Sequence, residues 1–513
     1  MNRLLWQITQ NNYLRRDYTM ESVPLGLPAA ILPSVQAVLS PDATSQFVRV
    51  QPNNLSSIVS SATSVSASAT VVSAISFPAT PIQFSIPAGA SPNVFIDHSK
   101  SSINFRVRYQ VSTADTTDYT GTTATLQGSA HSWFERCTEM INGQIIDDQT
   151  GWDVACNSDL AWGLNVADRD ANAVALGLYA EGSTDASGSF NRSTGHIIPA
   201  FTGTNLAAAS NYFSYNIPYK SAFAGVDAKS FTPIGRCGKY DITLYTPAVA
   251  PVSILNSGAA AGAGAEVTIT IDQINLELFY ITLDQQSAAL LPSMDKPWAL
   301  SGVTHRTGSG TLAASVSGAV SIQVPIRVKS ARSLATRFSE NSRTIATGAA
   351  NGKYDSKAVL ASSMSYFLAG QKRVPNLPHS SQFNLSRLFA HTQQAYYDKG
   401  IERWMSRCGY TMNDFAKYAA STTAPTAATQ YDQMLVDAGS ATVLTSLAGF
   451  EFAEDLRLAS TSQFLNGSDL TSSNSFLEMN LLSGTSNQQN ITFIAKADII
   501  FVVMPNGNVE ARV

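Results

Sequence analysis

The chain has 513 residues, of which 44% are hydrophobic and only 14% are charged, against roughly 25% charged residues in an average soluble protein. This length accommodates two or more domains, and the apolar content with a net charge of −4 excludes a disordered chain. The balance of 33 basic and 37 acidic residues argues against coating nucleic acid as the main activity, and the charge-poor composition suits a large β-protein whose surface is covered by neighbouring subunits.

Residues 1–60 are expected to form an N-terminal arm. The segment begins with a short amphipathic stretch and carries a basic pair at Arg15 and Arg16. Its end overlaps the low-complexity stretch Ser56–Ala74, whose Val and Ile content favours an edge strand or a clasp. The beginning lacks the apolar run of a signal peptide, and no stretch reaches the roughly 18 apolar residues of a membrane helix, so we expect no membrane span.

The first half of the chain contains strand patterns. Residues Ile103–Val111 alternate apolar and polar side chains with a period of two, which is typical of a half-buried strand. Similar patterns occur at Tyr212–Ile217, Tyr240–Tyr245 and Val267–Leu283. The last of these is long and is expected to close the first half.

The second half repeats this organisation. Strands are expected at Ala319–Val328, Ser363–Leu368, Phe476–Leu482, Ile491–Met504 and Val509–Val513. Pro325 indicates that its strand is an edge strand or contains a bulge. Phe476–Leu482 and Ile491–Met504 are expected to pair as a hairpin, and helices are expected at Asn384–Met405 and Thr411–Ala420.

The two halves end on similar strands. Ile269–Ile271 begins the closing strand of the first half, and Ile491–Phe493 begins that of the second, 491 − 269 = 222 residues later. This spacing predicts two β-domains in tandem, and long loops between irregularly spaced strands are typical of jelly rolls. We therefore expect an all-β chain with short helices in loops: an arm at 1–60, a first jelly roll at 61–290 and a second at 291–513.

No motif of an enzyme stands out. None of the six histidines is followed by Glu as in a zinc-protease helix, and no G-x-S-x-G nucleophile motif occurs. The four cysteines, Cys137, Cys156, Cys237 and Cys408, are widely spaced, which favours buried reduced thiols over a zinc site. His131 and Cys137 could form a thiol–imidazole pair, but a buried thiol beside a hydrogen-bonded histidine is the more ordinary interpretation.

Two kinds of charged cluster are candidate binding sites. Asp147, Asp148 and Asp153 could hold calcium, but their spacing is irregular and surface carboxylates explain them equally well. Basic pairs, Arg106 with Arg108 and Lys372 with Arg373, could touch nucleic acid, but no wider basic patch interleaved with aromatic residues accompanies them. We therefore expect no catalytic, cofactor-binding or metal-binding residue.

Several motifs follow one another in order along residues 90–513. They are Phe95–Ser102 with the strand Ile103–Tyr109, Gly128–Arg136, Ile141–Asp148, Ser363–Pro378, and Asp498–Val509 with its Pro-Asn-Gly turn. In this order they resemble the double jelly-roll major capsid proteins of viruses, nearest to those of virophages and Polinton-like viruses.

The resemblance implies a non-enzymatic building block of a virus shell. Three copies would form a pseudo-hexagonal homotrimeric capsomer, and these capsomers would tile an icosahedral capsid. Neighbouring capsomers, penton proteins and minor capsid proteins would be its partners, with at most weak contact to packaged DNA. The arm at 1–60 lies outside the resemblance, and we expect it to tie capsomers together. The protein would be assembled inside the host cell and would reside in the virion.

A carbohydrate-binding or carbohydrate-active β-sandwich protein is the alternative. It would use aromatic side chains such as Trp133, Trp152 and Trp162 together with exposed carboxylates. An exposed aromatic platform, or a carboxylate pair at glycosidase spacing in a cleft, would favour this alternative.

Overall fold

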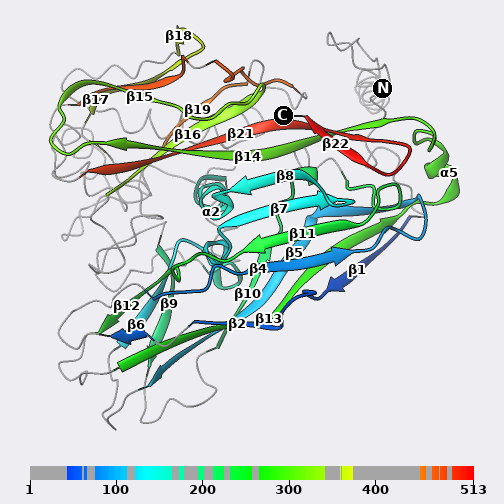
Figure 1. Ribbon diagram of the computed structural model, residues 1–513, viewed down its shortest axis with the longest axis horizontal. Helices are drawn as coiled ribbons and strands as arrows, with labels where there is room; N and C mark the ends of the chain where they lie inside the picture. The colour runs from blue at the N-terminus through cyan, green and yellow to red at the C-terminus, as the bar shows by residue number, and fades with distance from the viewer. Residues whose placement is uncertain are drawn as a thin grey trace, which may run out of the picture.

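The computed structural model consists mainly of antiparallel strands (Figure 1). It describes residues 43–60, 63–65, 75–112, 122–163, 173–177, 194–201, 212–224, 231–256, 265–340, 359, 361–373, 451–457, 465–472, 474–481 and 488–512. The expected helices Asn384–Met405 and Thr411–Ala420, and residues 1–42 of the expected arm, lie outside the described residues.

The first half forms a sandwich of two sheets, ordered β1-β13-β5-β10 and β4-β11-β7-β8. The strands are β1 (Thr44–Val50), β4 (Pro81–Ile86), β5 (Val94–Ser112), β7 (Arg136–Ile141), β8 (Gln144–Thr150), β10 (Tyr212–Pro218), β11 (Tyr240–Tyr245) and β13 (Ala265–Thr282). When these strands are counted from 1 to 8 along the chain, the sheets read 1-8-3-6 and 2-7-4-5.

The second half repeats this order, with sheets β14-β21-β16-β19 and β15-β20-β17-β18. The strands are β14 (Trp298–Leu312), β15 (Gly318–Gln323), β16 (Ala331–Glu340), β17 (Ala361–Leu368), β18 (Gln371–Lys372), β19 (Glu451–Asp455), β20 (Phe476–Leu481) and β21 (Gln489–Val503). The same count gives 1-8-3-6 and 2-7-4-5 again. This order, with both sheets antiparallel, is that of a jelly roll, so the predicted all-β fold with two tandem jelly rolls is confirmed.

The remaining elements decorate this frame. A small sheet, β12-β6-β9, is formed by β6 (Thr122–Gln127), β9 (Thr194–Phe201) and β12 (Val252–Asn256), which come from three loops of the first jelly roll. β22 (Val509–Arg512) pairs with the end of β21. The helical segments are short: η2 (Ala130–Trp133), α2 (Trp152–Gly163), α4 (Ala173–Leu176), η3 (Ala222–Ala224) and α5 (Gln285–Ala289).

Each jelly roll buries apolar side chains between its sheets. In β5 the predicted alternation holds: Ile103, Phe105 and Val107 are buried, and the polar residues between them are half-exposed. In β13 a bulge between Asp272 and Asn275 shifts the register, so the residues that face the core change from odd to even positions.

The prediction that Phe476–Leu482 and Ile491–Met504 pair as a hairpin is wrong. β20 pairs with β15 and β17, whereas β21 pairs with β14, β16 and β22, in the other sheet. In this topology the last connection crosses the sandwich, so two adjacent strands do not pair. The strand expected at Ala319–Val328 ends at Gln323, before Pro325, and it is an edge strand as predicted.

Part of the expected arm belongs to the first jelly roll. Within residues 44–59, β1 and β2 (Ser57–Val59) hydrogen-bond to β13, as does β3 (Thr63–Val65) further on. The edge strand predicted within Ser56–Ala74 is therefore confirmed, and the first sheet begins at Thr44, before residue 61. The boundary expected at residue 290 lies between α5 and β14 and stays a prediction.

Candidate functional site: the seam between the two jelly rolls

The two jelly rolls meet along β8 and β14, which run side by side at the centre of the molecule (Figure 1). We call this junction the seam. It consists of β8, α2 and η3 from the first jelly roll and of β14, β16, β19 and β21 from the second. Three features hold it: a polar network at β8, the helix α2, and a pair of stacked aromatic rings.

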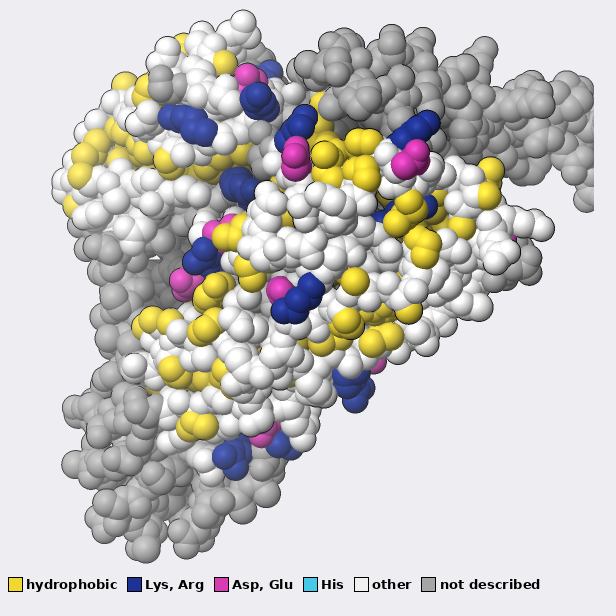
Figure 2. Space-filling model, turned by 45° about the vertical axis from the view of Figure 1, so that its right-hand side comes forward, with side chains coloured by type: hydrophobic (Ala, Val, Ile, Leu, Met, Phe, Trp, Pro, Cys, Tyr) yellow, Lys and Arg dark blue, Asp and Glu magenta, His cyan; other side chains and the backbone are white. Residues whose placement is uncertain are grey.

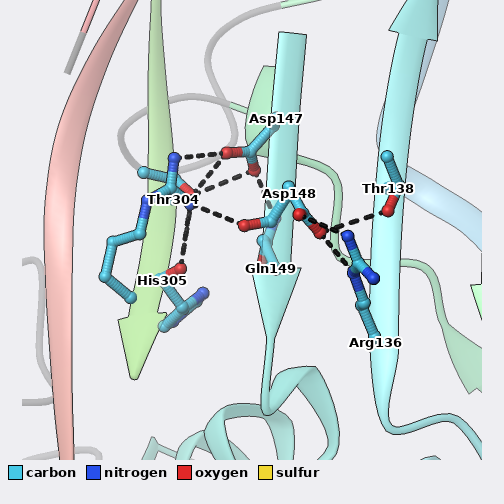
Figure 3. A network of polar contacts seen from close by, with 8 residues as sticks. Arg136, Thr138, Asp147, Asp148, Gln149, Thr304 and His305 are labelled. Atoms are coloured by element: carbon cyan, nitrogen blue, oxygen red, sulfur yellow. Dashed lines mark hydrogen bonds and ion pairs between the residues drawn. The ribbon is translucent and has the colours of Figure 1, made fainter. Parts of the chain in front are cut away.

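Asp147 is the centre of the polar network (Figure 3). Its carboxylate accepts hydrogen bonds from Thr304 Oγ1 at 2.9 and 3.0 Å and from Arg306 Nη2 at 2.8 Å, both from β14. Gln149 Nε2 donates to the same carboxylate at 2.8 Å. The Asp147 side chain is fully buried and has lost its hydrating water. These hydrogen bonds take the place of that water.

Its neighbour Asp148 lies on the more exposed face of β8. Arg136 donates two hydrogen bonds to this carboxylate, at 2.7 and 2.6 Å, and Thr138 donates a third at 3.2 Å (Figure 3). Burial raises the pKa of Asp148, but the hydrogen bonds and charge of Arg136 outweigh it and the pKa lies below its ordinary value. Because Arg136 and Asp148 are both about a third exposed, their pair contributes little stability.

Helix α2 fills the space beside β14. Its Val154 and Ala155 pack against Ala335, Ala453 and Ile494 of the second jelly roll in a separate buried cluster. This cluster is formed by both jelly rolls, so α2 acts as an apolar wedge between them.

Polar groups of α2 bind the second jelly roll as well. Ser158 Oγ donates to Glu451 at 2.7 Å, and the same carboxylate lies 3.1 Å from Arg337. Asp159 accepts from Lys220 at 2.6 Å and lies 3.4 Å from His305. Burial raises the pKa of Asp159, but the charges of Lys220, Lys496 and His305 lower it well below its ordinary value. Asp159 therefore stays ionised inside the seam.

A second apolar contact of the seam is the stack of Phe223 on Phe501. These rings stack with centroids 4.1 Å apart, and Phe223 also meets Tyr240 edge to face at 6.1 Å. Gly302 of β14 lies in the same place: a Cβ there would come within 2.5 Å of the Ala222 carbonyl oxygen. The backbones of the two jelly rolls thus approach too closely here for a side chain.

Replacing Gly302 by Ala should therefore lower the free energy of unfolding by about 1–3 kcal/mol, because backbone atoms of the first jelly roll must move. The measurement is the urea midpoint of the variant. Gly310→Ala on the same strand is the matched control: its Cβ would lie 3.2 Å from the Ile322 side chain, which can shift, and we expect a smaller loss. Equal losses for the two variants would contradict the close approach.

A second buried carboxylate lies beside Asp147. Glu139 of β7 is 1% exposed and is directly opposite Asp147 in the register of β7 with β8. The hydroxyls of Tyr219 and Tyr240 donate to Glu139 Oε1 at 2.5 and 2.8 Å. Burial and the charge of Asp147 raise the pKa of Glu139 to about 7, although hydrogen bonds from Ser221, Tyr219 and Tyr240 lower it.

The structure does not pair His131 with Cys137. The His131 ring lies 3.1 Å from the Pro218 carbonyl oxygen and 3.3 Å from Ser129 Oγ, and burial lowers its pKa to about 3. Cys137 faces Tyr219, and burial raises its pKa well above the ordinary value. Both residues are buried structural groups.

The three carboxylates of the candidate calcium site do not point to a common centre. Asp147 and Asp148 point to β14 and to Arg136, as described above, and Asp153 is buried on α2. Within the described ranges, no group of three or more His, Cys, Asp or Glu residues is placed to hold a metal ion.

Three of the four residues in the candidate basic pairs take part in hydrogen bonds or ion pairs on their own jelly roll. Arg106 makes a two-bond ion pair with Asp272 across β5 and β13, at 2.7 and 2.8 Å. Lys372 lies 3.3 Å from Glu478, and Arg373 donates to Ser468. On the described part of the face in Figure 2, basic and acidic side chains mostly lie next to each other, a distribution unlike the basic stripe of a nucleic-acid-binding surface.

The aromatic residues of the carbohydrate alternative are not on the surface. Trp133 and Trp152 are 0% and 1% exposed, and Trp152 Nε1 donates to the Lys220 carbonyl oxygen at 3.3 Å. Trp162 lies in α2, and its side chain is outside the described residues. These two tryptophans therefore belong to the core and do not form a sugar-binding platform.

No protein-family model and no curated protein matches the sequence. Solved structures that match include viral particles and capsid proteins, as the sequence motifs predicted. A chain from the Sputnik virophage is 11% identical, with a TM-score of 0.47 and coverage of 96% of this chain and 94% of that chain.

Two further matches have titles that name major capsid proteins. The mavirus protein is 9% identical, with a TM-score of 0.44 and coverage of 96% of both chains. The Faustovirus protein is 9% identical, with a TM-score of 0.46 and coverage of 94% of this chain and 92% of that one. These are likenesses of fold, and the assignment of two jelly rolls stands on the strand order of this chain. No helix among the described residues is long and apolar enough to cross a membrane.

Proposed function

We propose that this protein is a major capsid protein, a structural subunit that forms pseudo-hexagonal homotrimeric capsomers in an icosahedral virus shell. The observation that carries this proposal is the repeat of one jelly-roll order twice in a single chain, with the two copies held side by side by a buried seam. A chain with two such units supplies two sides of a hexagon, and three chains complete it. Its place is the virion, and it is assembled inside the host cell.

The charge distribution fits a subunit whose sides are covered by neighbours. With 14% charged residues, the chain presents few ions that would lose water at a contact without gaining a partner. Interfaces of permanent complexes bury roughly 2,000 Å² or more and have cores depleted of charged residues. In this proposal the protein acts through its contacts with other subunits and has no enzymatic role.

We assign the side of the molecule that carries strand β1 to a contact between subunits. Strand β1 is the end strand of its sheet, and Phe47 on it is 58% exposed and packs edge to face on Phe279 at 4.9 Å. A seven-residue edge strand with an exposed aromatic ring can pair with a strand of another chain. We therefore expect a neighbouring subunit to cover it. Neighbouring capsomers, penton proteins, minor capsid proteins and weak contact with packaged DNA complete the proposed set of partners.

Light scattering tests the oligomeric state. The wild-type protein should have the mass of three chains across a wide concentration range, whereas Phe47→Asp should shift it toward the mass of one chain, because a carboxylate would lose its water in the contact. Val249→Asp, at a position 39% exposed elsewhere, is the matched control and should stay trimeric. A wild-type protein that is monomeric at every concentration would contradict the proposed function; a trimeric Phe47→Asp would contradict only the assigned side.

A further inference from the structure

At the edge of the seam, two carboxylate residues are opposite each other on neighbouring strands of the first jelly roll. Glu139 of β7 and Asp147 of β8 are opposite in register, and their side chains are buried. Asp147 is compensated by Arg306, Thr304 and Gln149. Within the described residues no Lys, Arg or His forms an ion pair with Glu139, whose hydrogen bonds come from neutral hydroxyl groups.

The groups around Glu139 come from several elements. Tyr219, which follows β10, and Tyr240 of β11 donate hydroxyl hydrogen bonds to it, and Asp147 supplies the one charge that raises its pKa. Beyond them, Cys137 lies 3.9 Å from the Tyr219 hydroxyl, and the His98 ring packs on both tyrosines. Burial lowers the pKa of His98 to about 3, so His98 stays neutral and offers no charge to balance an ionised Glu139.

Glu139 is also linked to the second jelly roll by apolar contacts. Tyr240, which binds its carboxylate, meets Phe223, and Phe223 stacks on Phe501 of β21. The polar link runs through Asp147 to Thr304 and Arg306 of β14. A change in the charge of Glu139 therefore acts on both kinds of contact that close the seam.

We propose that Glu139 makes the seam respond to pH, holding the two jelly rolls together when it is protonated and loosening them when it is ionised. This inference rests on the proposed function, since it concerns how firmly the two halves of a capsomer subunit are joined. In acid Glu139 is protonated and neutral, so Asp147, which accepts from Arg306, carries the one negative charge of the pair. At alkaline pH two negative charges share one buried site, and opening the seam to water relieves both their repulsion and the loss of hydration.

The sign and size of the effect follow from the pKa of Glu139, which is about 7 in the closed protein against an ordinary value of 4.5. A raised pKa favours the closed state fully below the ordinary value, and this preference is lost as pH rises through about 7. If opening restores the ordinary value, the population of the open seam should increase about tenfold from roughly pH 6 to pH 8.5.

Thiol labelling of the full-length protein tests this inference. Cys137 and Cys156 are buried beside the seam, so a thiol reagent modifies them only when the seam opens, and mass spectrometry reports each site. The rate for the wild type is divided by that for Glu139→Gln at each pH, which cancels the intrinsic pH dependence of the reagent. The ratio should rise about tenfold from roughly pH 6 to pH 8.5. Glu510→Gln, at a half-exposed carboxylate of β22, is the control, and its labelling should follow the wild type throughout.

Tyr240→Phe supplies a second measurement should Glu139→Gln fold poorly. Removing a hydroxyl that stabilises the ionised carboxylate should raise the pKa of Glu139 further and move the midpoint of the labelling change to higher pH. A flat ratio for Glu139→Gln, or an unmoved midpoint for Tyr240→Phe, would overturn the inference. If the protein forms trimers but the labelling ratio stays flat, this inference fails and the proposed function stands. If the ratio rises in a protein that never forms trimers, only the proposed function is refuted.

Discussion

Asp147→Ala should lower the free energy of unfolding by about 3 kcal/mol, near the lower end of the cost of breaking a buried ion pair. The substitution removes the carboxylate that accepts hydrogen bonds from Arg306 Nη2 and Thr304 Oγ1 of β14 across the seam. The guanidinium of Arg306 is about a quarter exposed, so water recovers part of the loss. Urea unfolding at neutral pH measures the effect.

Asp148→Ala is the matched control, one residue along the same strand. Asp148 and its partner Arg136 are each about a third exposed, and exposed ion pairs are worth at most about 1 kcal/mol. Equal losses for Asp147→Ala and Asp148→Ala would show that the seam does not depend on the buried carboxylate.

Phe223→Ala should cost about 3–5 kcal/mol and should also loosen the seam. The substitution removes the ring that stacks on Phe501 at 4.1 Å and packs edge to face on Tyr240, leaving a cavity between the jelly rolls. The expected signature is a lower urea midpoint together with faster labelling of Cys156 under native conditions, since Cys156 lies on α2 in the seam.

Phe105→Ala separates the loss of stability from the loosening of the seam. Phe105 packs on Phe134 at 5.0 Å and on Tyr215 at 5.4 Å, entirely within the first jelly roll. Its truncation should cost a similar free energy, while Cys156 labelling in the native state stays close to that of the wild type. If both variants expose Cys156 equally, the ring of Phe223 has no special role at the junction.

The strands that the sequence predicts best are those with one buried face. β5 and β11 carry regular alternation, and β13 and β21 stand out by their length and their aliphatic content. These features are local, and the period of side chains along a strand reveals them. The 222-residue spacing of the closing strands indicated the tandem repeat because β13 and β21 hold the same place in their jelly rolls.

Helix α2 was not predicted, because it is buried on nearly every side. Residues 152–158 are all buried, so no polar face alternates with an apolar one, and the period of 3.6 residues is absent. The hairpin error has a related cause: a turn between two strands does not reveal whether the chain turns back in one sheet or crosses to the other.

The seam itself depends on contacts that no local pattern encodes. Asp147 and Asp148 are identical neighbours, yet one points to Thr304 across 157 residues and the other to Arg136, because successive side chains of a strand point to opposite faces. Glu139 reads in the sequence as an ordinary strand residue. It is distinguished by its position opposite Asp147 and by the hydrogen bonds that it accepts from two tyrosine hydroxyls.

Electron microscopy of the purified full-length protein tests the central claim most directly. We predict particles of three copies in which six jelly rolls form a pseudo-hexagonal ring, with the β1 side of each copy against a neighbour and with closed shells under assembly conditions. Single particles that contain only one pair of jelly rolls, at every concentration and pH examined, would contradict it.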